Sequence, residues 1–197
     1  MSLIALLLAA AAPQTTPPPA PPKVDCGDAD HRALDFWIGD WDVYATGSKT
    51  LVANSHIEKI VGCAISETFD QFIGPTGMPL DYDGRSISAY VPADKGWRQY
   101  YVDGGGTAAT LTGGVIDKAM VWLSTNGPVT NRMTLGPNSD GSIRQRGEAS
   151  TDGGKTWSPA YDFTYVRSKN TTGVVNVILR REYVGVLTRK VPRKRRK

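Results

Sequence analysis

The chain alternates short strand-like runs with turn signals over most of its length. Apolar and polar residues alternate within these runs, and Gly, Pro, Asn and Asp cluster between them at intervals of about 8–12 residues. No stretch keeps a sustained helical periodicity. The runs predict ten strands, at about 40–47, 50–61, 63–72, 84–91, 96–103, 107–113, 118–125, 130–136, 142–150 and 160–167. Because a flat sheet leaves unpaired edges, we predict an all-β fold, an antiparallel up-and-down barrel closed on itself.

One short helix is expected, around Asp28–Phe36, where it would close one mouth of the barrel. The predicted barrel covers residues 26–167 of a 197-residue chain. This length predicts a single domain, long enough to bury a core of its own.

An aromatic turn leads into the first predicted strand. The sequence there is Leu34-Asp35-Phe36-Trp37-Ile38-Gly39-Asp40-Trp41-Asp42-Val43-Tyr44. It is similar to the opening of calycin barrels, the lipocalins and fatty-acid-binding proteins. It more closely resembles a bacterial family of exported proteins, a domain of unknown function that opens with Phe-Trp-x-Gly-x-Trp-Asp. The resemblance spans about Asp35 to Arg167.

The resemblance implies a calycin-type, lipocalin-like barrel and does not name a ligand. It implies structural roles for Gly39 and Trp41, whose Gly-x-Trp plugs one end of the barrel. In lipocalins an Arg from a late strand packs against this indole, and we assign that role to Arg167, the last Arg of the matching region.

The amino terminus has the composition of an export signal. Residues 3–12 form an apolar run of ten that is too short to span a bilayer, and cleavage after Ala11 would leave Ala9 three positions before the cut. We interpret residues 1–12 as a signal peptide and 13–25 as a Pro-rich spacer. A retained hydrophobic anchor is the alternative. Export predicts a periplasmic or secreted bacterial protein.

The chain has two cysteines, Cys26 and Cys63. An oxidising compartment would permit a disulfide that ties the amino-terminal arm to the barrel wall. Two independent thiols are the alternative.

The charge divides unevenly along the chain. Residues 168–197 hold ten Lys and Arg and one Glu, which leaves 13 Lys and Arg against 18 Asp and Glu in residues 1–167. We interpret 168–197 as a basic carboxy-terminal extension, either functional or an artefact of the reading frame. Its last residues, 190–197, could bind an anionic membrane surface. We expect no nucleic-acid partner for an exported protein, and the sequence carries no signal of oligomeric state.

Signatures of catalysis are missing from the sequence. There is no Gly-x-Ser-x-Gly, no phosphate-binding glycine loop and no Cys-x-x-Cys. The haem-binding calycins use a late His, and neither His31 nor His56 is late. We expect no enzyme activity, no cofactor and no metal. Asp81 and Asp83 are interpreted as part of a turn-forming loop, and 150–157 as a single Asp-box turn of structural role.

Polar and aromatic residues that alternate along three strands are the candidates for a binding site. They are Trp97, Gln99, Tyr101, Arg146, Glu148, Tyr161 and Tyr165. Facing inward, such residues would line a small-molecule cavity, or they would simply fill the core. We favour an exported, non-catalytic barrel that binds a small, partly apolar ligand in its interior. The alternative is an envelope or surface protein whose basic tail makes the functional contact, with the barrel as scaffold.

Overall fold

The computed structural model describes residues 24–169, which form ten strands and one short helical turn. Before the first strand lies η1, a 3-10 helix (Asp35–Trp37). The strands are β1 (Gly39–Ala45), β2 (Leu51–Lys59), β3 (Ile65–Ile73), β4 (Pro79–Val91), β5 (Gly96–Asp103), β6 (Ala108–Ile116), β7 (Ala119–Asn126), β8 (Val129–Pro137), β9 (Ile143–Ser150) and β10 (Ser158–Arg167). No helix in this part of the chain is long and apolar enough to cross a membrane.

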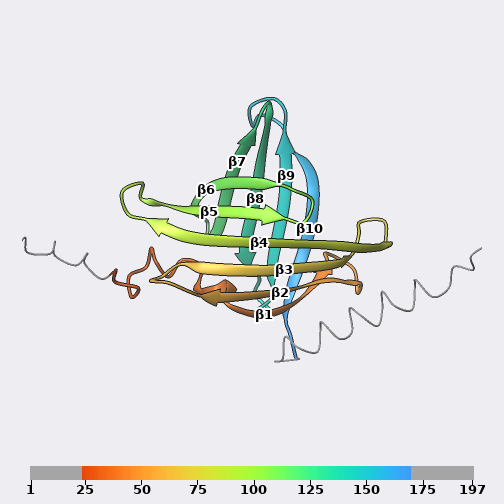
Figure 1. The fold of residues 1–197 in the computed structure, drawn as a ribbon, viewed down its shortest axis with the longest axis horizontal. Helices are drawn as coiled ribbons and strands as arrows, with labels where there is room; N and C mark the ends of the chain where they lie inside the picture. The colour runs from red at the N-terminus through yellow and green to blue at the C-terminus, as the bar shows by residue number, and fades with distance from the viewer. Residues whose placement is uncertain (1–23, 170–197) are drawn as a thin grey trace, which may run out of the picture.

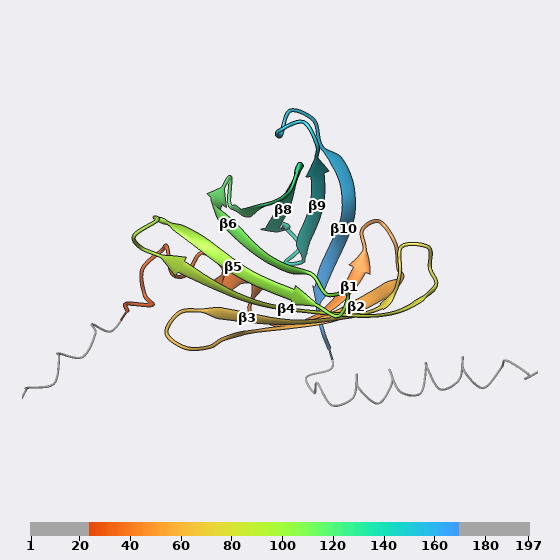
Figure 2. The same ribbon diagram turned by 45° about the horizontal axis from the view of Figure 1, so that its top comes forward.

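The strands form one closed antiparallel barrel in up-and-down order. Each strand pairs with its neighbours in sequence, and β1 closes the barrel against β10, where Trp41 lies opposite Arg167 and Ala45 opposite Phe163. In Figure 1, β2–β5 run across the view while β7–β10 rise across them, and Figure 2 shows β10 curving down to meet β1. The predicted closed ten-stranded barrel is therefore confirmed.

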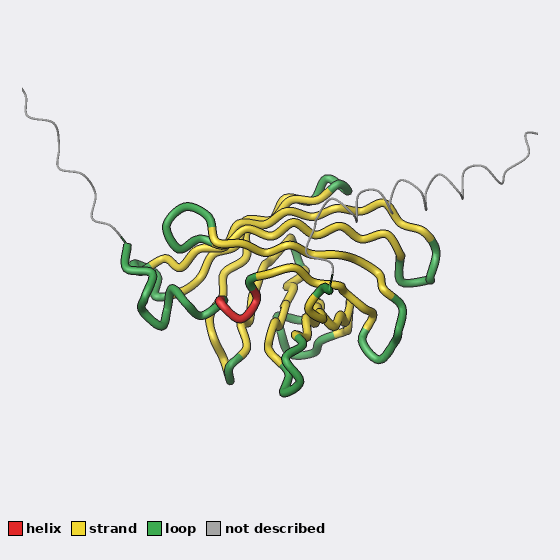
Figure 3. Tube along the Cα trace, turned by 90° about the horizontal axis from the view of Figure 1, so that it is seen from below, coloured by secondary structure: helices red, strands yellow, loops and turns green. Residues whose placement is uncertain are grey.

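Two local predictions differ from the structure. The predicted loop at Asp81 and Asp83 is part of β4, because tertiary pairing with β3 sets Asp83 against Asp70 and Tyr82 against Gln71. The helix expected around 28–36 is mostly a series of turns and shrinks to η1, drawn in red in Figure 3. The turn propensities of single residues do not indicate which strand a segment pairs with or how it packs, so both positions were predicted wrongly.

Gly39, Trp41 and Arg167 pack together at one end of the barrel, which we call the closed end. Trp41 is fully buried, and its Nε1 donates a hydrogen bond to the Trp37 carbonyl at 2.8 Å. The Arg167 guanidinium carbon lies 3.9 Å from the centroid of the indole, and its Nη1 donates to the Ile38 carbonyl at 2.5 Å. This is the contact that the resemblance implies.

Glycine is required at position 39. Its φ is +133°, and a Cβ there would lie 1.8 Å from Arg167 Nη1. The first strand and the guanidinium can approach only because this residue has no side chain.

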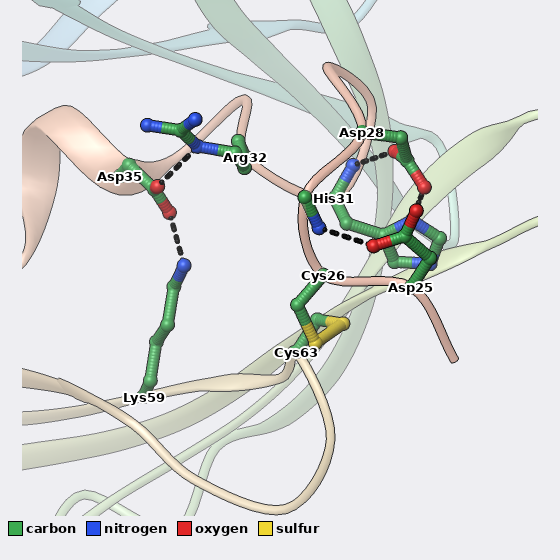
Figure 4. Close-up of a disulfide and its surroundings, with 9 residues drawn as sticks. Asp25, Cys26, Asp28, His31, Arg32, Asp35, Lys59 and Cys63 are labelled. Atoms are coloured by element: carbon green, nitrogen blue, oxygen red, sulfur yellow. Dashed lines mark hydrogen bonds and ion pairs between the residues drawn. A yellow bond between two sulfur atoms is a disulfide. The ribbon is translucent and has the colours of Figure 1, made fainter. Parts of the chain in front are cut away.

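The amino-terminal arm is fastened over the closed end. Cys26 and Cys63 form the predicted disulfide, shown in Figure 4. Lys59 Nζ contacts Asp35 Oδ1 at 2.7 Å, so the end of β2 also holds η1. The Tyr90 hydroxyl donates to Asp30 Oδ2 at 2.9 Å, on the far side of the same end. Covalent and polar contacts from β2, from the loop that follows it and from β4 thus fasten the arm to this end of the barrel.

The Asp-box segment is a self-contained turn between β9 and β10. Asp152 Oδ1 accepts backbone N–H bonds from Lys155 and Thr156 at 3.0 and 2.9 Å. Trp157 Nε1 donates to the Gly154 carbonyl at 3.0 Å, so the indole folds back on the turn. These contacts lie within the turn and define its shape.

Candidate functional site

Burial differs between the two ends of the barrel interior. Inward-facing side chains near η1 are fully buried, among them Trp41, Ile65 and Tyr165. At the opposite end, the inward-facing side chains keep part of their surface exposed. These are Tyr82, Tyr101, Asp103, Ala109, Tyr161 and Phe163. Solvent therefore reaches the interior from this side, which we call the open mouth.

A row of aromatic rings crosses the open mouth from β3 to β10. The ring centroids of Phe69 and Phe163 lie 6.2 Å apart, and Tyr161 stacks on Phe163 at 5.3 Å. The ring of Tyr161 covers Gly147 of β9, where a Cβ would lie 2.2 Å from it. A glycine at this position therefore sets the place of the Tyr161 ring.

A second row of side chains at the mouth is polar, and consists of two tyrosines and an aspartate on β4 and β5. The hydroxyls of Tyr82 and Tyr101 are hydrogen bonded to each other, and Tyr82 donates to Asp103 Oδ2 at 3.1 Å. Partial burial raises the pKa of the Asp103 carboxyl group. Hydrogen bonds from the backbone N–H groups of Thr107 and Gly105 together have the larger effect, so the pKa lies below its usual value. Asp103 is therefore an anion at the rim of the mouth.

Deeper in the barrel lies Glu67, a buried carboxyl group on β3. Its Oε1 accepts a hydrogen bond from the Ser55 hydroxyl at 3.2 Å, and its Oε2 accepts one from Ser86 at 3.1 Å. Gln99 supports this arrangement because its Nε2 donates to the hydroxyl oxygens of Ser86 and Ser88, at 3.3 and 3.1 Å. Burial raises the pKa of Glu67 from 4.5 to about 7, although the serine hydroxyls act in the other direction. Glu67 therefore changes its charge near neutral pH.

Five of the predicted site residues point into the barrel, but they do not share one site. Trp97 lies at the closed end, where its Nε1 donates to the Asp30 carbonyl at 3.1 Å. Tyr165 is fully buried and donates to Gln145 Oε1 at 2.6 Å. Gln99 belongs to the Glu67 hydrogen-bond network. Only Tyr101 and Tyr161 lie at the open mouth.

The expectation that Arg146 and Glu148 line the cavity is corrected by the structure. Gln145 faces the interior, so strand alternation turns both residues outward. Glu148 accepts hydrogen bonds there from Arg132 at 2.8 Å and from Arg146 at 3.1 Å. The guanidinium of Arg132 also stacks on Trp157 at 4.0 Å, so these residues form an outer bridge that braces the Asp-box turn. The sequence showed that they share a face but not which face.

Sequence reasoning missed Glu67, Tyr82 and Phe69 as members of the site. A usable signal was present on β3, where Ile65, Glu67 and Phe69 alternate with polar neighbours. When an acidic residue lies on an otherwise apolar strand face, either the predicted register is wrong by one residue or the carboxyl group is buried.

A second candidate site is a hollow of about 420 Å³ on the outer face of β4–β6. Its outward-facing walls include Arg85, Ile87, Tyr100 and Val102, and the last three are about half exposed. This hollow is open and lies on the opposite side of the sheet from the mouth residues.

Neither histidine is placed as part of a metal site. His56 is exposed, and its Nδ1 contacts Asp40 Oδ1 at 2.6 Å on the outer surface. His31 is buried under the amino-terminal arm and contacts Asp28 at 2.6 Å. Within residues 24–169, no three His, Cys, Asp or Glu side chains are grouped so that they could hold a metal ion.

The open mouth brings together aromatic faces and a few polar groups, the side chains that typically line small-molecule sites. Comparisons of the chain with models of known protein families and with curated proteins found no match.

Proposed function

We propose that this protein is an exported barrel that binds a small, partly apolar molecule at the open mouth, without catalysis. The observation that carries the proposal is that the aromatic row of the open mouth lies next to the buried Glu67 network, because Phe69 follows Glu67 on the same inward face of β3. Aromatic faces supply apolar contact area, while Glu67 and Asp103 supply fixed polar groups.

Export of the protein is supported by the apolar amino-terminal run and by the disulfide, because disulfides persist in oxidising compartments. The basic extension, on which the alternative function depends, lies outside the described residues apart from Ser168 and Lys169.

A matched pair of variants tests where the ligand binds. Ala109 faces inward opposite Tyr101, while its neighbour Ala108 is exposed on the outer face. Ala109→Trp should fill the mouth, and Ala108→Trp adds the same indole outside it. The probe is the neutral fluorescent dye N-phenylnaphthylamine, which brightens in apolar surroundings.

We expect the wild-type protein and Ala108→Trp to take up the dye, and Ala109→Trp to lose at least about tenfold in affinity. Because Ala108 lines the outer hollow of β4–β6, loss of uptake by Ala108→Trp alone would place binding in that hollow. Equal uptake by both variants would place binding at neither site and would overturn the mouth as the binding site. No uptake by wild-type protein, together with native mass spectra free of any co-purified small molecule, would overturn the proposal.

A further inference from the structure

We propose that the open mouth selects organic cations, an amine or quaternary ammonium group on an apolar body, over carboxylates. This inference rests on the proposed function and names the ligand class for the same site. It follows from the direction in which the charged side chains of the barrel point.

The acidic groups of the mouth point inward, whereas the arginines of the surrounding strands point outward and Lys59 of β2 contacts Asp35 at the closed end. Glu67 and Asp103 face the interior, as their bonds to Ser86 and Tyr82 show. In the described part of the chain, the arginines on the same strands and their neighbours lie on the outer face, in ion pairs with outer acids. These arginines are Arg85, Arg98, Arg132, Arg144 and Arg146. Arg167 lies at the other end, over Trp41.

The walls of the mouth suit a cation because they present aromatic faces. Tyr161 and Phe163 stack with an interplanar angle of 21°, so a ligand would meet the outer faces and the edges of the stacked pair. Tyr101 lies across from them over Gly84, where a Cβ would lie 2.8 Å from the tyrosine hydroxyl oxygen. The negative faces of aromatic rings attract ammonium groups, most strongly where water is excluded.

The polar contacts of Glu67 suit a cation and disfavour an anion. Both carboxyl oxygens already accept bonds from serine hydroxyls, and each retains a further lone pair. A ligand ammonium group could use these acceptors. A ligand carboxylate would find the serine donors already engaged and would face two carboxyl groups of the protein.

The preference for cations should depend on pH. Among the described groups that face the mouth, only Glu67 should change its charge near neutral pH. Burial is the first cause that raises the pKa of Tyr82, Tyr101, Tyr161 and Tyr165 above the usual value, so these hydroxyls stay neutral. Asp103 stays ionised, and the charge of the outward-facing Arg85 lowers the pKa of Glu67, although burial outweighs this effect. Cation affinity should therefore rise from about pH 6 to about pH 8, as Glu67 loses its proton.

The test compares three competitors that share one alkyl chain: decyltrimethylammonium, decanol and decanoate. Each is titrated below its micelle concentration against N-phenylnaphthylamine bound to the wild-type protein. We expect the ammonium compound to displace the dye at roughly one tenth of the concentration that decanoate needs.

Glu67→Gln should remove most of this preference and leave displacement by decanol unchanged. Glu58→Gln is the matched control, because it removes the same charge from an exposed position on the outer face of β2 and should keep the preference.

Equal displacement by the ammonium compound and decanoate, or stronger displacement by decanoate, would overturn cation selectivity while leaving interior binding intact. If Glu67→Gln does not fold, the wild-type protein decides the matter. A preference for the ammonium compound that stays constant between about pH 6 and about pH 8 would then overturn the role of Glu67.

Discussion

The guanidinium of Arg167 lies 3.9 Å above the Trp41 ring and so joins the last strand of the barrel to the first. The same side chain bonds the Ile38 carbonyl and rests against Gly39. One residue at the end of β10 thereby holds the seam of the barrel, the entry to β1 and the indole that fills the closed end.

Removing this indole should destabilise the barrel strongly. Trp41→Ala should lower the free energy of unfolding by about 3–5 kcal/mol, since it empties a fully buried site. Arg167→Gln should cost up to about 2 kcal/mol through the lost cation–π contact. Urea unfolding measures both. Arg98→Gln, which removes an exposed ion pair with Asp94 and a hydrogen bond with Tyr100, is the control and should cost about 1 kcal/mol or less. A Trp41→Ala protein as stable as wild type would refute the plug.

Gly39→Ala should be costly for two separate reasons. Its φ of +133° is unfavourable for alanine, and the new Cβ would collide with Arg167. We expect a loss of roughly 2–4 kcal/mol. Gly47→Ala is the matched control, because its φ is +78° but no atom lies within 4 Å of the new Cβ. It should cost only about 1 kcal/mol. Equal losses in thermal unfolding would show that the Arg167 contact contributes nothing.

The disulfide should make a large contribution to stability. Cys26 and Cys63 are 37 positions apart, a loop whose closure in the unfolded chain is worth about 3–4 kcal/mol. Replacing both cysteines by serine should lower the unfolding free energy by about that amount. Intact mass should rise by about two units when the wild-type protein is reduced, because each sulfur gains a hydrogen. An unchanged urea midpoint for the double variant would contradict the prediction.

Glu67 should make stability fall as pH rises. Its pKa is raised from 4.5 to about 7 by burial, so the folded state binds a proton in this window that the unfolded state has released. Stability from this group is therefore full below about pH 4.5 and is lost as pH rises to about 7, by up to about 3 kcal/mol. Glu67→Gln should flatten this part of the curve. Urea unfolding at several pH values measures it, and parallel curves for the two proteins would show that Glu67 is not the group responsible.

Much of the architecture followed from local sequence patterns. Alternation and turn spacing predicted the ten strands, and the barrel follows because closure leaves no edge strand unpaired. The Gly-x-Trp opening implied the closed end, including the Arg167 partner. Each of these features depends on residues near one another in sequence or on a pattern repeated along the chain.

The binding site depended on information that the sequence alone does not contain. Alternation showed that Arg146 and Glu148 share a strand face, but only the buried hydrogen bond from Tyr165 to Gln145 showed that this face is the outer one. Asp81 and Asp83 have loop-like neighbours, yet pairing with β3 makes them part of a strand. Glu67 became a buried, titrating group because strands from both sides brought it two serines. The sequence determined the strand periodicity and the closed end, whereas the tertiary structure decided which charges face inward, because register and closure are set jointly by all ten strands.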